Sequence, residues 1–212
     1  MTPRARYIAV EGTIGVGKTS LARRLAATYN ASLLLEQAED NPFLERFYRQ
    51  PRSGALPAQL FFLFQRAKQL EALHQQDLFA QLHVADYLFA KDRLFAGINL
   101  DADELALYEQ VYQRLAPELP QPDLVIYLQA PTDVLLERIA RRGIVYEQQI
   151  GADYLERLNN AYASFFYDYR VAPLLIVNAA QADFVSRDQD YQQLLHELRQ
   201  IKPGRHYFNP AY

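Results

Sequence analysis

The sequence predicts an α/β protein in which a five-stranded parallel sheet is flanked by helices on both faces. Short apolar runs of strand length alternate along the chain with longer segments of helical spacing. Strands that alternate with crossover helices form parallel sheets. The run at 123–130 is continuously apolar, as in a strand that is covered on both faces. No linker divides the chain, so we expect one domain over residues 1–212.

The expected elements follow one another as strands and helices along the chain. The helical segment 56–78 contains the run LFFLF, which is apolar on every side of a helix and predicts deep burial. Asp101 and Glu104 have the spacing of a capping box, which predicts a helix start. Gly143 is expected to end another helix. The expected strands are 7–11, 32–36, 82–86, 123–130 and 174–178, and the expected helices are 18–29, 56–78, 101–115, 131–142, 151–169 and 188–201.

The composition narrows the class of protein. Half of the 212 residues are hydrophobic and the net charge is −3, so no positive field favours nucleic acid or an anionic membrane as a partner. No apolar run approaches the roughly 20 residues of a membrane span. The absence of cysteine excludes disulfides, thiol nucleophiles and thiolate metal sites. We therefore expect a cytoplasmic protein.

Residues 12–19 read GTIGVGKT, which fits the pattern G-x-x-x-x-G-K-[ST] between an expected strand and an expected helix. The glycines let backbone N–H groups turn toward phosphate oxygens, and the helix N-terminus adds its positive dipole end. Lys18 should reach the β- and γ-phosphates, and the Thr19 hydroxyl should hold Mg²⁺. The pattern predicts a P-loop NTPase fold that binds a nucleoside triphosphate through Gly12, Thr13, Ile14, Gly15, Val16, Gly17, Lys18, Thr19 and Ser20.

The expected strand at 123–130 favours a small kinase over an ATPase motor. An ATPase motor carries a Mg²⁺-binding acid at the end of its Walker B strand, whereas the strand at 123–130 ends in Gln129 and Ala130. The Asn-Lys-x-Asp stretch that reads guanine in GTPases is also absent from the sequence. A P-loop kinase with a small acceptor remains the better class.

Four segments in series resemble the deoxyribonucleoside kinases, the family of deoxycytidine, deoxyguanosine and deoxyadenosine kinases. They read EGTIGVGKTSLA, LLLEQAEDNPFLERFY, DLVIYLQAPTDVLLERIARRG and ADF, and they span nearly the whole chain in the family's order. The resemblance, which is stronger to bacterial members, implies transfer of the γ-phosphoryl group of ATP to the 5′-hydroxyl of a deoxyribonucleoside, for nucleotide salvage. It also implies a homodimer, whose interface the apolar helix surfaces at Leu56 and Leu105 could supply.

The acceptor side is expected around the second strand and the long helix. Glu36 follows the second strand, at the sheet edge where ligands bind, and the resemblance implies that it is the general base. Gln59 and Arg66 are two helical turns apart and share a face with Phe62 between them. The resemblance implies that this face contacts the substrate base. A solvated glutamate, a locally satisfied glutamine and a structural ion pair of Arg66 are the alternatives.

Asp86-Tyr87 departs from the family, in which an acid is followed by Arg-Ser at this point. Asp86 can still bind Mg²⁺, directly or through water. The missing arginine has no obvious replacement, and Lys91 and Arg93 are the candidates. This departure affects substrate identity more than the type of reaction.

Further substrate contacts are implied by the resemblance alone. Tyr48 and Glu147 match residues that reach the sugar 3′-hydroxyl, although a packed tyrosine and a solvated loop acid are the alternatives. Asp92 is the candidate acid that reads the base, with a helix-surface ion pair as the alternative, and Phe95 is the aromatic residue packed against the base.

A lid is expected over residues 138–150. Arg138 and Arg142 are one helical turn apart and share a face, with Arg141 beside them. Such a face near a phosphate loop suits a clamp on the donor phosphates, although a solvated basic face has the same spacing. Ile144 occupies a position at which relatives often have a further arginine.

The resemblance places Asp183 and Phe184 in a loop over the ATP adenine, with Phe184 as a stacking face or as ordinary core. The expected catalytic residues are Lys18, Glu36, Arg138 and Arg142. The preferred base is open, and deoxyadenosine is favoured because the chain resembles bacterial members. A P-loop kinase of another acceptor, such as a nucleoside monophosphate or a vitamin-related alcohol, and a non-catalytic nucleotide-binding regulator remain as alternatives.

Overall fold

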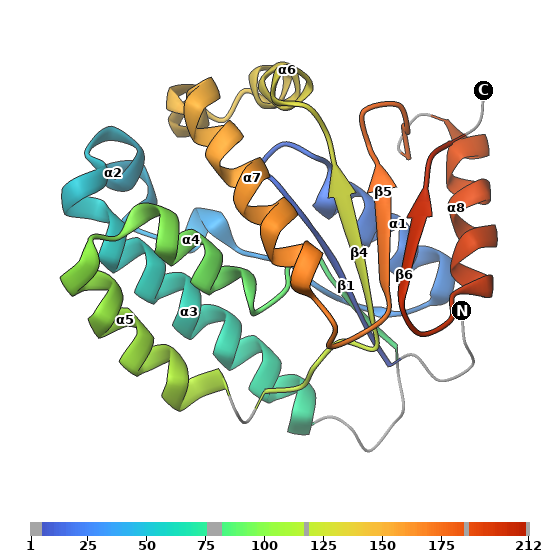
Figure 1. Ribbon diagram of the computed structural model, residues 1–212, viewed down its shortest axis with the longest axis horizontal. Helices are drawn as coiled ribbons and strands as arrows, with labels where there is room; N and C mark the ends of the chain where they lie inside the picture. Colours follow the sequence, from blue (N-terminus) through green and yellow to red (C-terminus); the bar gives the residue numbers. More distant parts are fainter. Residues whose placement is uncertain (1–5, 76–81, 117–118, 185–186, 211–212) are drawn as a thin grey trace.

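The computed structural model describes residues 6–75, 82–116, 119–184 and 187–210. A parallel sheet with the strand order β2-β3-β1-β4-β5-β6 forms the centre of the described chain (Figure 1). The strands are β1 (Tyr7–Gly12), β2 (Ser32–Leu34), β3 (His83–Ala85), β4 (Leu124–Gln129), β5 (Leu174–Asn178) and β6 (Arg205–Phe208). The parallel α/β fold predicted from the sequence is therefore confirmed.

The sheet has six strands in the described chain, so the prediction of five was wrong. The sixth strand, β6, pairs with β5 at the edge of the sheet, with Leu174 opposite Arg205. Its sequence RHYF is short and half polar, which an edge strand tolerates because it is less covered than a central strand. It therefore lacks the apolar run by which the other strands were predicted. Strands β2 and β3 end at Leu34 and Ala85, earlier than expected.

The helices largely agree with the expected segments. The capping box of Asp101 and Glu104 is present, and Gly143 ends its helix with a φ of 73°. Two helices, α2 and α4, were not predicted, and the expected helix end at Leu78 lies outside the described residues. The helices are α1 (Lys18–Tyr29), α2 (Leu44–Arg49), α3 (Pro51–Gln75), α4 (Lys91–Asn99), α5 (Ala102–Leu115), α6 (Thr132–Arg142), α7 (Ala152–Asp168) and α8 (Asp188–Gln200), with single turns η1 (Ala38–Asp40) and η4 (Val145–Gln149).

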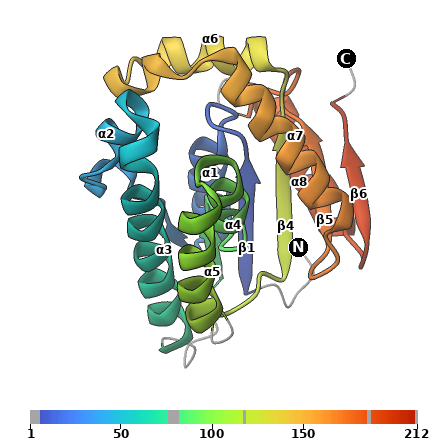
Figure 2. The ribbon, with the colours of Figure 1, turned by 60° about the vertical axis from the view of Figure 1, so that its left-hand side comes forward.

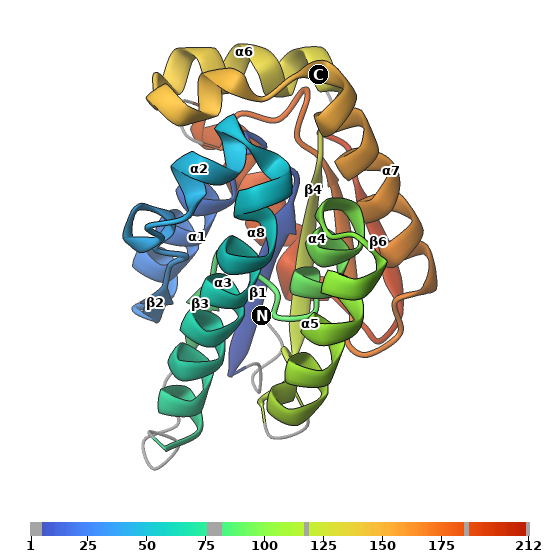
Figure 3. The ribbon, with the colours of Figure 1, turned by 90° about the vertical axis from the view of Figure 1, so that its left-hand side faces the viewer.

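The two faces of the sheet have separate cores because side chains alternate along a strand. Ile8 and Val10 of β1 pack in one core with α1 and α8, and Tyr7 and Ala9 pack in the other with α3, α4 and α5. Helix α7 contributes to both cores. Figures 1 and 3 show α6 crossing above the carboxyl ends of the strands. Helix α6 therefore covers part of this edge, which is where ligands bind in open parallel sheets.

The run LFFLF in α3 is less buried than its composition predicts. Leu63 is fully buried under the helix, whereas Phe64 is 52% exposed. One side of α3 packs against the sheet, and its opposite side faces outward (Figure 2). Helix α5 contacts α3 along its flank. The prediction of deep burial for the whole run was therefore wrong.

Among the described residues, no helix combines the length and the apolar character needed to cross a bilayer.

Candidate active site

The phosphate loop joins β1 to α1 in a conformation that depends on its glycines. Gly12, Gly15 and Gly17 have φ angles of 148°, 84° and 104°, which side chains rarely allow. A Cβ atom on Gly12 would also lie 2.4 Å from the Leu128 carbonyl oxygen. The Lys18 ammonium donates to the carbonyl oxygens of Gly12, at 2.8 Å, and Thr13, at 3.3 Å. The loop is thus shaped as the sequence pattern predicts.

Burial makes Lys18 an unusual lysine. Its pKa is lowered from 10.5 to about 8, mainly by desolvation and also by the nearby positive charge of Lys91, against the opposing effects of Glu11 and Asp86. An anion bound by the loop would favour the charged ammonium. The charge of Lys18 is therefore suited to a phosphate ligand.

Two residues that sequence reasoning missed, Glu11 and Asn159, accept hydrogen bonds from the phosphate loop. The Glu11 carboxylate is fully buried and accepts hydrogen bonds from the backbone N–H of Gly12 at 2.8 Å and of Leu88 at 2.7 Å, and from the Tyr162 hydroxyl at 2.9 Å. The Thr13 hydroxyl donates to Asn159 Oδ1 of α7 at 2.6 Å. An acid at the end of an apolar strand was the sequence signal for Glu11, whereas Asn159 had none.

Two clefts meet at the phosphate loop. The first, of about 760 Å³, lies between the loop, α2, α3 and α4, and the second, of about 570 Å³, lies between the loop, α6 and the segment after β5. Gly15, Lys18, Thr19 and Arg142 line both clefts. The first is also lined by the predicted residues Ile14, Glu36, Tyr48, Gln59, Phe62, Arg66, Asp86, Phe95 and Glu147, and the second by Val16, Gly17, Ser20, Arg138, Asp183 and Phe184.

Three predicted residues lie outside the lining of both clefts. Gly12 and the 2%-exposed Thr13 belong to the phosphate loop but line neither cleft. Asp92 is 0% exposed and contacts the Nη1 atom of Arg66. Burial raises its pKa to about 6, against the opposing charges of Arg66 and Lys91. A contact of Asp92 with the substrate base stays a prediction, while its contact with Arg66 is direct.

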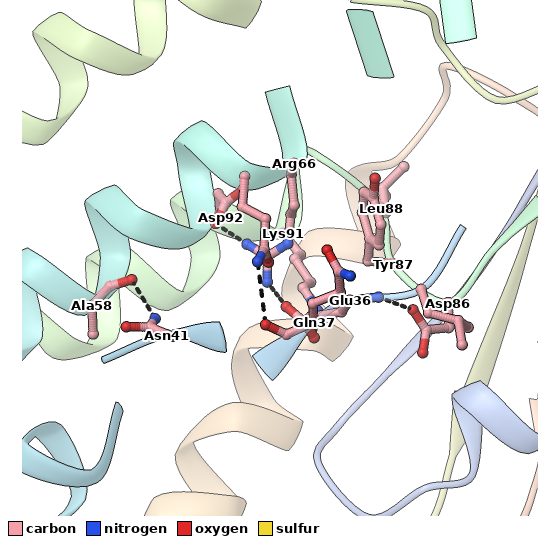
Figure 4. Close-up of polar contacts among 12 residues, drawn as sticks. Glu36, Gln37, Asn41, Ala58, Arg66, Asp86, Tyr87, Leu88, Lys91 and Asp92 are labelled. Carbon is pink, nitrogen blue, oxygen red and sulfur yellow. Dashed lines mark hydrogen bonds and ion pairs between the residues drawn. The ribbon is translucent and has the colours of Figure 1, made fainter. Parts of the chain in front are cut away.

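Asp86 joins three elements at the floor of the first cleft. Its Oδ1 atom accepts the backbone N–H of Glu36 at 2.7 Å (Figure 4). Its Oδ2 atom accepts the Thr19 hydroxyl at 2.5 Å. The ends of β2 and β3 are thereby tied to the start of α1. Two oxygen ligands of the kind that Mg²⁺ prefers, the Thr19 hydroxyl and the Asp86 carboxylate, lie together at the loop.

The Glu36 carboxylate is held at both oxygens by cations. Oε1 pairs with Arg66 Nη2, and Oε2 accepts a hydrogen bond from Lys91 Nζ at 3.0 Å (Figure 4). Arg66 in turn pairs with Asp92, so α3 and α4 are linked to the end of β2 by charge. A carboxylate held in this way has one fixed orientation toward the cleft, which suits a group that accepts a proton.

The residue after Asp86 does not supply a cation to this cluster. Tyr87 is fully buried in the core, where its hydroxyl donates to Gln69 Oε1 at 2.7 Å. Of the two replacements considered, Arg93 pairs with Glu109 away from the clefts, whereas Lys91 lines the first cleft and contacts Glu36. The sequence offered both cations two residues apart, and without α4 in view it could not select one.

Aromatic rings surround the polar groups of the first cleft. The Arg66 guanidinium carbon lies 4.9 Å from the centre of the Phe62 ring, and the Lys91 ammonium lies 5.8 Å from that of Phe95. Tyr48 stacks on Tyr146 of η4, with ring centres 5.8 Å apart. This stacking connects α2 to the segment that was predicted as a lid.

Helix α6 brings its arginines over the phosphate loop. Arg138 donates to the carbonyl oxygens of Val16 at 3.1 Å and Ala179 at 2.8 Å, and burial lowers its pKa. Arg142 pairs with Glu147 of η4 and borders both clefts. Phe184 is only 7% exposed and packs against Phe208, so its stacking on an adenine stays a prediction.

Comparisons with known proteins show the family of this chain. The family model of the deoxynucleoside kinases matches residues 8–202. A deoxyguanosine kinase of Bacillus subtilis (strain 168) is 34% identical over 93% of this chain and 98% of its own, and a deoxyadenosine kinase of Dictyostelium discoideum is 31% identical over 92% and 80%. The solved structure of a deoxyadenosine kinase from M. mycoides, with the products dCMP and dCDP bound, has a TM-score of 0.80 and 26% identity, and the match covers 92% of this chain and all of that one. The chain therefore belongs to the deoxynucleoside kinase family, as an enzyme that phosphorylates deoxynucleosides with ATP.

Proposed function

We propose that this chain, as a single cytoplasmic domain, transfers the γ-phosphoryl group of Mg·ATP to the 5′-hydroxyl of deoxyadenosine and so forms the 5′-monophosphate in nucleotide salvage. One observation carries the proposal. Two clefts meet at Lys18, Thr19 and Arg142; Glu36 lines only the first of them, and Arg138 lines only the second. ATP would occupy the cleft under α6, and the nucleoside would occupy the cleft that contains Glu36.

The residues of the first cleft would prepare the acceptor. Glu36, held by Arg66 and Lys91, orients the 5′-hydroxyl and accepts its proton as the phosphoryl group is transferred. Tyr48 and Glu147 are our candidates for the sugar 3′-hydroxyl. Phe62 and Phe95 provide apolar surface for the base on either side of Arg66 and Lys91.

Thr19 and Asp86 would hold the metal ion. Their oxygens lie 2.5 Å apart at the phosphate loop, so a hard divalent cation fits the donor set that the chain presents. Mg²⁺, when bound, would neutralise charge on the β- and γ-phosphates. The hydrogen bond from the Glu36 backbone to Asp86 keeps Glu36, the proposed general base, next to this metal site.

The preference for adenine is inferred from Gln59. The side-chain amide of this residue offers one donor and one acceptor, which match the N6 amine and N7 of adenine. Guanine presents two acceptors at the same edge, which suit an arginine, and Arg66 is already engaged by Glu36 and Asp92. Deoxyguanosine is the second candidate, because the Bacillus subtilis relative is a deoxyguanosine kinase.

A panel of acceptors tests the substrate. The protein is incubated with Mg·ATP and each deoxynucleoside, ribonucleoside or nucleoside monophosphate, and ADP release is followed. We expect deoxyadenosine to have the highest kcat/KM, by at least about tenfold over deoxyguanosine. A preference for deoxyguanosine would reverse the role of Gln59. Release of ADP with monophosphates alone, or with no member of the panel, would favour another acceptor or a regulator.

Arg142→Ala is expected to lower kcat by about tenfold to a hundredfold, with a smaller change in the KM for the nucleoside. The reason is that a guanidinium at the junction of the clefts can stabilise charge on the transferring group. Steady-state kinetics with both substrates varied measures the effect, and Arg49→Ala, on the exposed surface of α2, is the control. A rise in nucleoside KM at constant kcat would instead assign Arg142 to substrate binding.

We also propose a homodimer. Phe64 of α3 and Leu107 of α5 are exposed apolar side chains on helices that contact each other (Figure 2). Burial of such side chains against a second copy would remove apolar surface from water. Light scattering on the purified protein gives the mass directly, and replacement of both residues by aspartate should halve it.

A further inference from the structure

Lys91 occupies a position that packing alone does not favour. It is the first residue of α4, where the helix dipole disfavours a positive charge. Its side chain is only 3% exposed, and a buried ammonium is costly unless an anion compensates for the lost hydration. The group that accepts its hydrogen bond is the Glu36 carboxylate, at 3.0 Å. The chain thus accepts a doubly unfavourable location for a lysine in order to place an ammonium beside Glu36.

Charged groups from six elements face this ammonium. They are Glu11 at the end of β1, Lys18 of α1, Glu36 after β2, Arg66 of α3, Asp86 after β3, and Asp92 of α4 itself. Lys91 and Lys18 are close enough that the charge of Lys91 lowers the pKa of Lys18. Two like charges that repel each other at one cleft make that cleft attractive to an anion. Lys91 therefore lies close enough to act on Lys18 of the phosphate loop while it contacts Glu36.

We propose that Lys91 is a positioning residue of this kinase, which holds the Glu36 carboxylate in its reactive orientation and provides the cation that Tyr87 cannot provide. The inference rests on the proposed function. Arg66 fixes one oxygen of Glu36 and Lys91 fixes the other, so that removal of either cation leaves the carboxylate free to rotate. Arg66 cannot replace Lys91 because it is also bound to Asp92.

A lysine in this role makes the reaction sensitive to alkaline pH. Burial lowers the pKa of Lys91 from 10.5 to about 8, with Glu11 acting in the opposite direction and Arg66 in the same one. The ammonium is present below that pH and is lost above it, so kcat should fall as the pH rises through about 8. Arginine keeps its charge throughout this range. Lys91→Arg should therefore remove the alkaline decline in kcat.

The experiment compares wild type, Lys91→Met, Lys91→Arg and Arg93→Met at saturating Mg·ATP, so that bound phosphate keeps Lys18 charged. We expect Lys91→Met to lose about a hundredfold in kcat, with the nucleoside KM changed by a few fold at most. We expect Lys91→Arg to recover most of the loss and to keep its rate above pH 8. Arg93→Met, two residues along α4 in the exposed pair with Glu109, is the matched control and should behave as wild type.

The kinetics of the Lys91 variants either support or overturn the role of Lys91. Near-normal turnover in Lys91→Met, or an alkaline decline in Lys91→Arg identical to that of wild type, would overturn the role of Lys91. If Lys91→Met does not fold, the pH profile of Lys91→Arg gives the answer alone. Wild type is assayed first on the nucleoside panel, and absence of any phosphorylation there would overturn the proposed function and this inference together. Activity in wild type with an indifferent Lys91 overturns only the inference.

Discussion

Glu36→Gln is expected to lower kcat by about a hundredfold or more while the KM for ATP stays similar. Glutamine has the size of glutamate, and its single carbonyl oxygen can still accept a hydrogen bond from Arg66 or from Lys91, but its amide cannot take the proton of the acceptor hydroxyl. Because Glu36 lines the first cleft and not the second, where we propose that ATP binds, the donor site should be preserved. Initial rates at saturating deoxyadenosine and varied ATP measure both constants.

Glu45→Gln serves as the control for this variant. Glu45 forms an exposed pair with Arg49 on α2, so its loss should change neither kcat nor either KM. Thermal unfolding of both variants reports whether the buried cations around position 36 destabilise the fold when the charge is removed. A folded Glu36→Gln protein with wild-type turnover would show that another group accepts the proton.

Lys18→Met is expected to lower kcat/KM for ATP by about a thousandfold. Methionine keeps much of the side chain's length but removes the ammonium that donates toward the phosphate loop. The loop backbone, set by Gly12, Gly15 and Gly17, should persist in the variant. Kinetics with varied Mg·ATP, together with a direct measurement of ATP binding, separate a loss of affinity from a loss of turnover.

The exposed Lys68 of α3 provides the matched control, because Lys68→Met removes the same charge outside the clefts. Its kinetics should equal those of wild type. If Lys18→Met retained full activity, the donor phosphates would have to bind elsewhere, and the second cleft would lose its proposed ligand.

Local sequence signals predicted the conformation of the phosphate loop. The phosphate loop is specified by glycines and by a strand and helix that flank it, and all of this information lies within one short segment. The same is true of the capping box at Asp101 and the helix end at Gly143. Where a feature depends on neighbours in sequence, the physical chemistry of those neighbours is sufficient to predict it.

Features that depend on distant parts of the chain were harder to predict. The strand β6 forms because β5 offers an open edge, and its own four residues carry little apolar signal. Phe64 is exposed because α3 is covered on one side only. Asp92 lies behind Arg66 because α4 begins at Lys91, and α4 was not predicted.

The same dependence explains the missing arginine. Asp86 and Tyr87 follow one another in sequence, but the turn into α4 sends Tyr87 into the core and Lys91 into the cleft. The cation that contacts Glu36 is therefore specified by the path of the chain after β3, and spacing alone could not distinguish Lys91 from Arg93.

In the proposed reaction, the γ-phosphoryl group passes from ATP to the 5′-oxygen of a deoxynucleoside. The most direct test incubates the protein with Mg²⁺, deoxyadenosine and ATP labelled at the γ-phosphate, and then identifies the labelled products by chromatography against standards. We expect the label in deoxyadenosine 5′-monophosphate, formed in equal amount to ADP. Label recovered as inorganic phosphate, or in a 3′-monophosphate, would contradict the account.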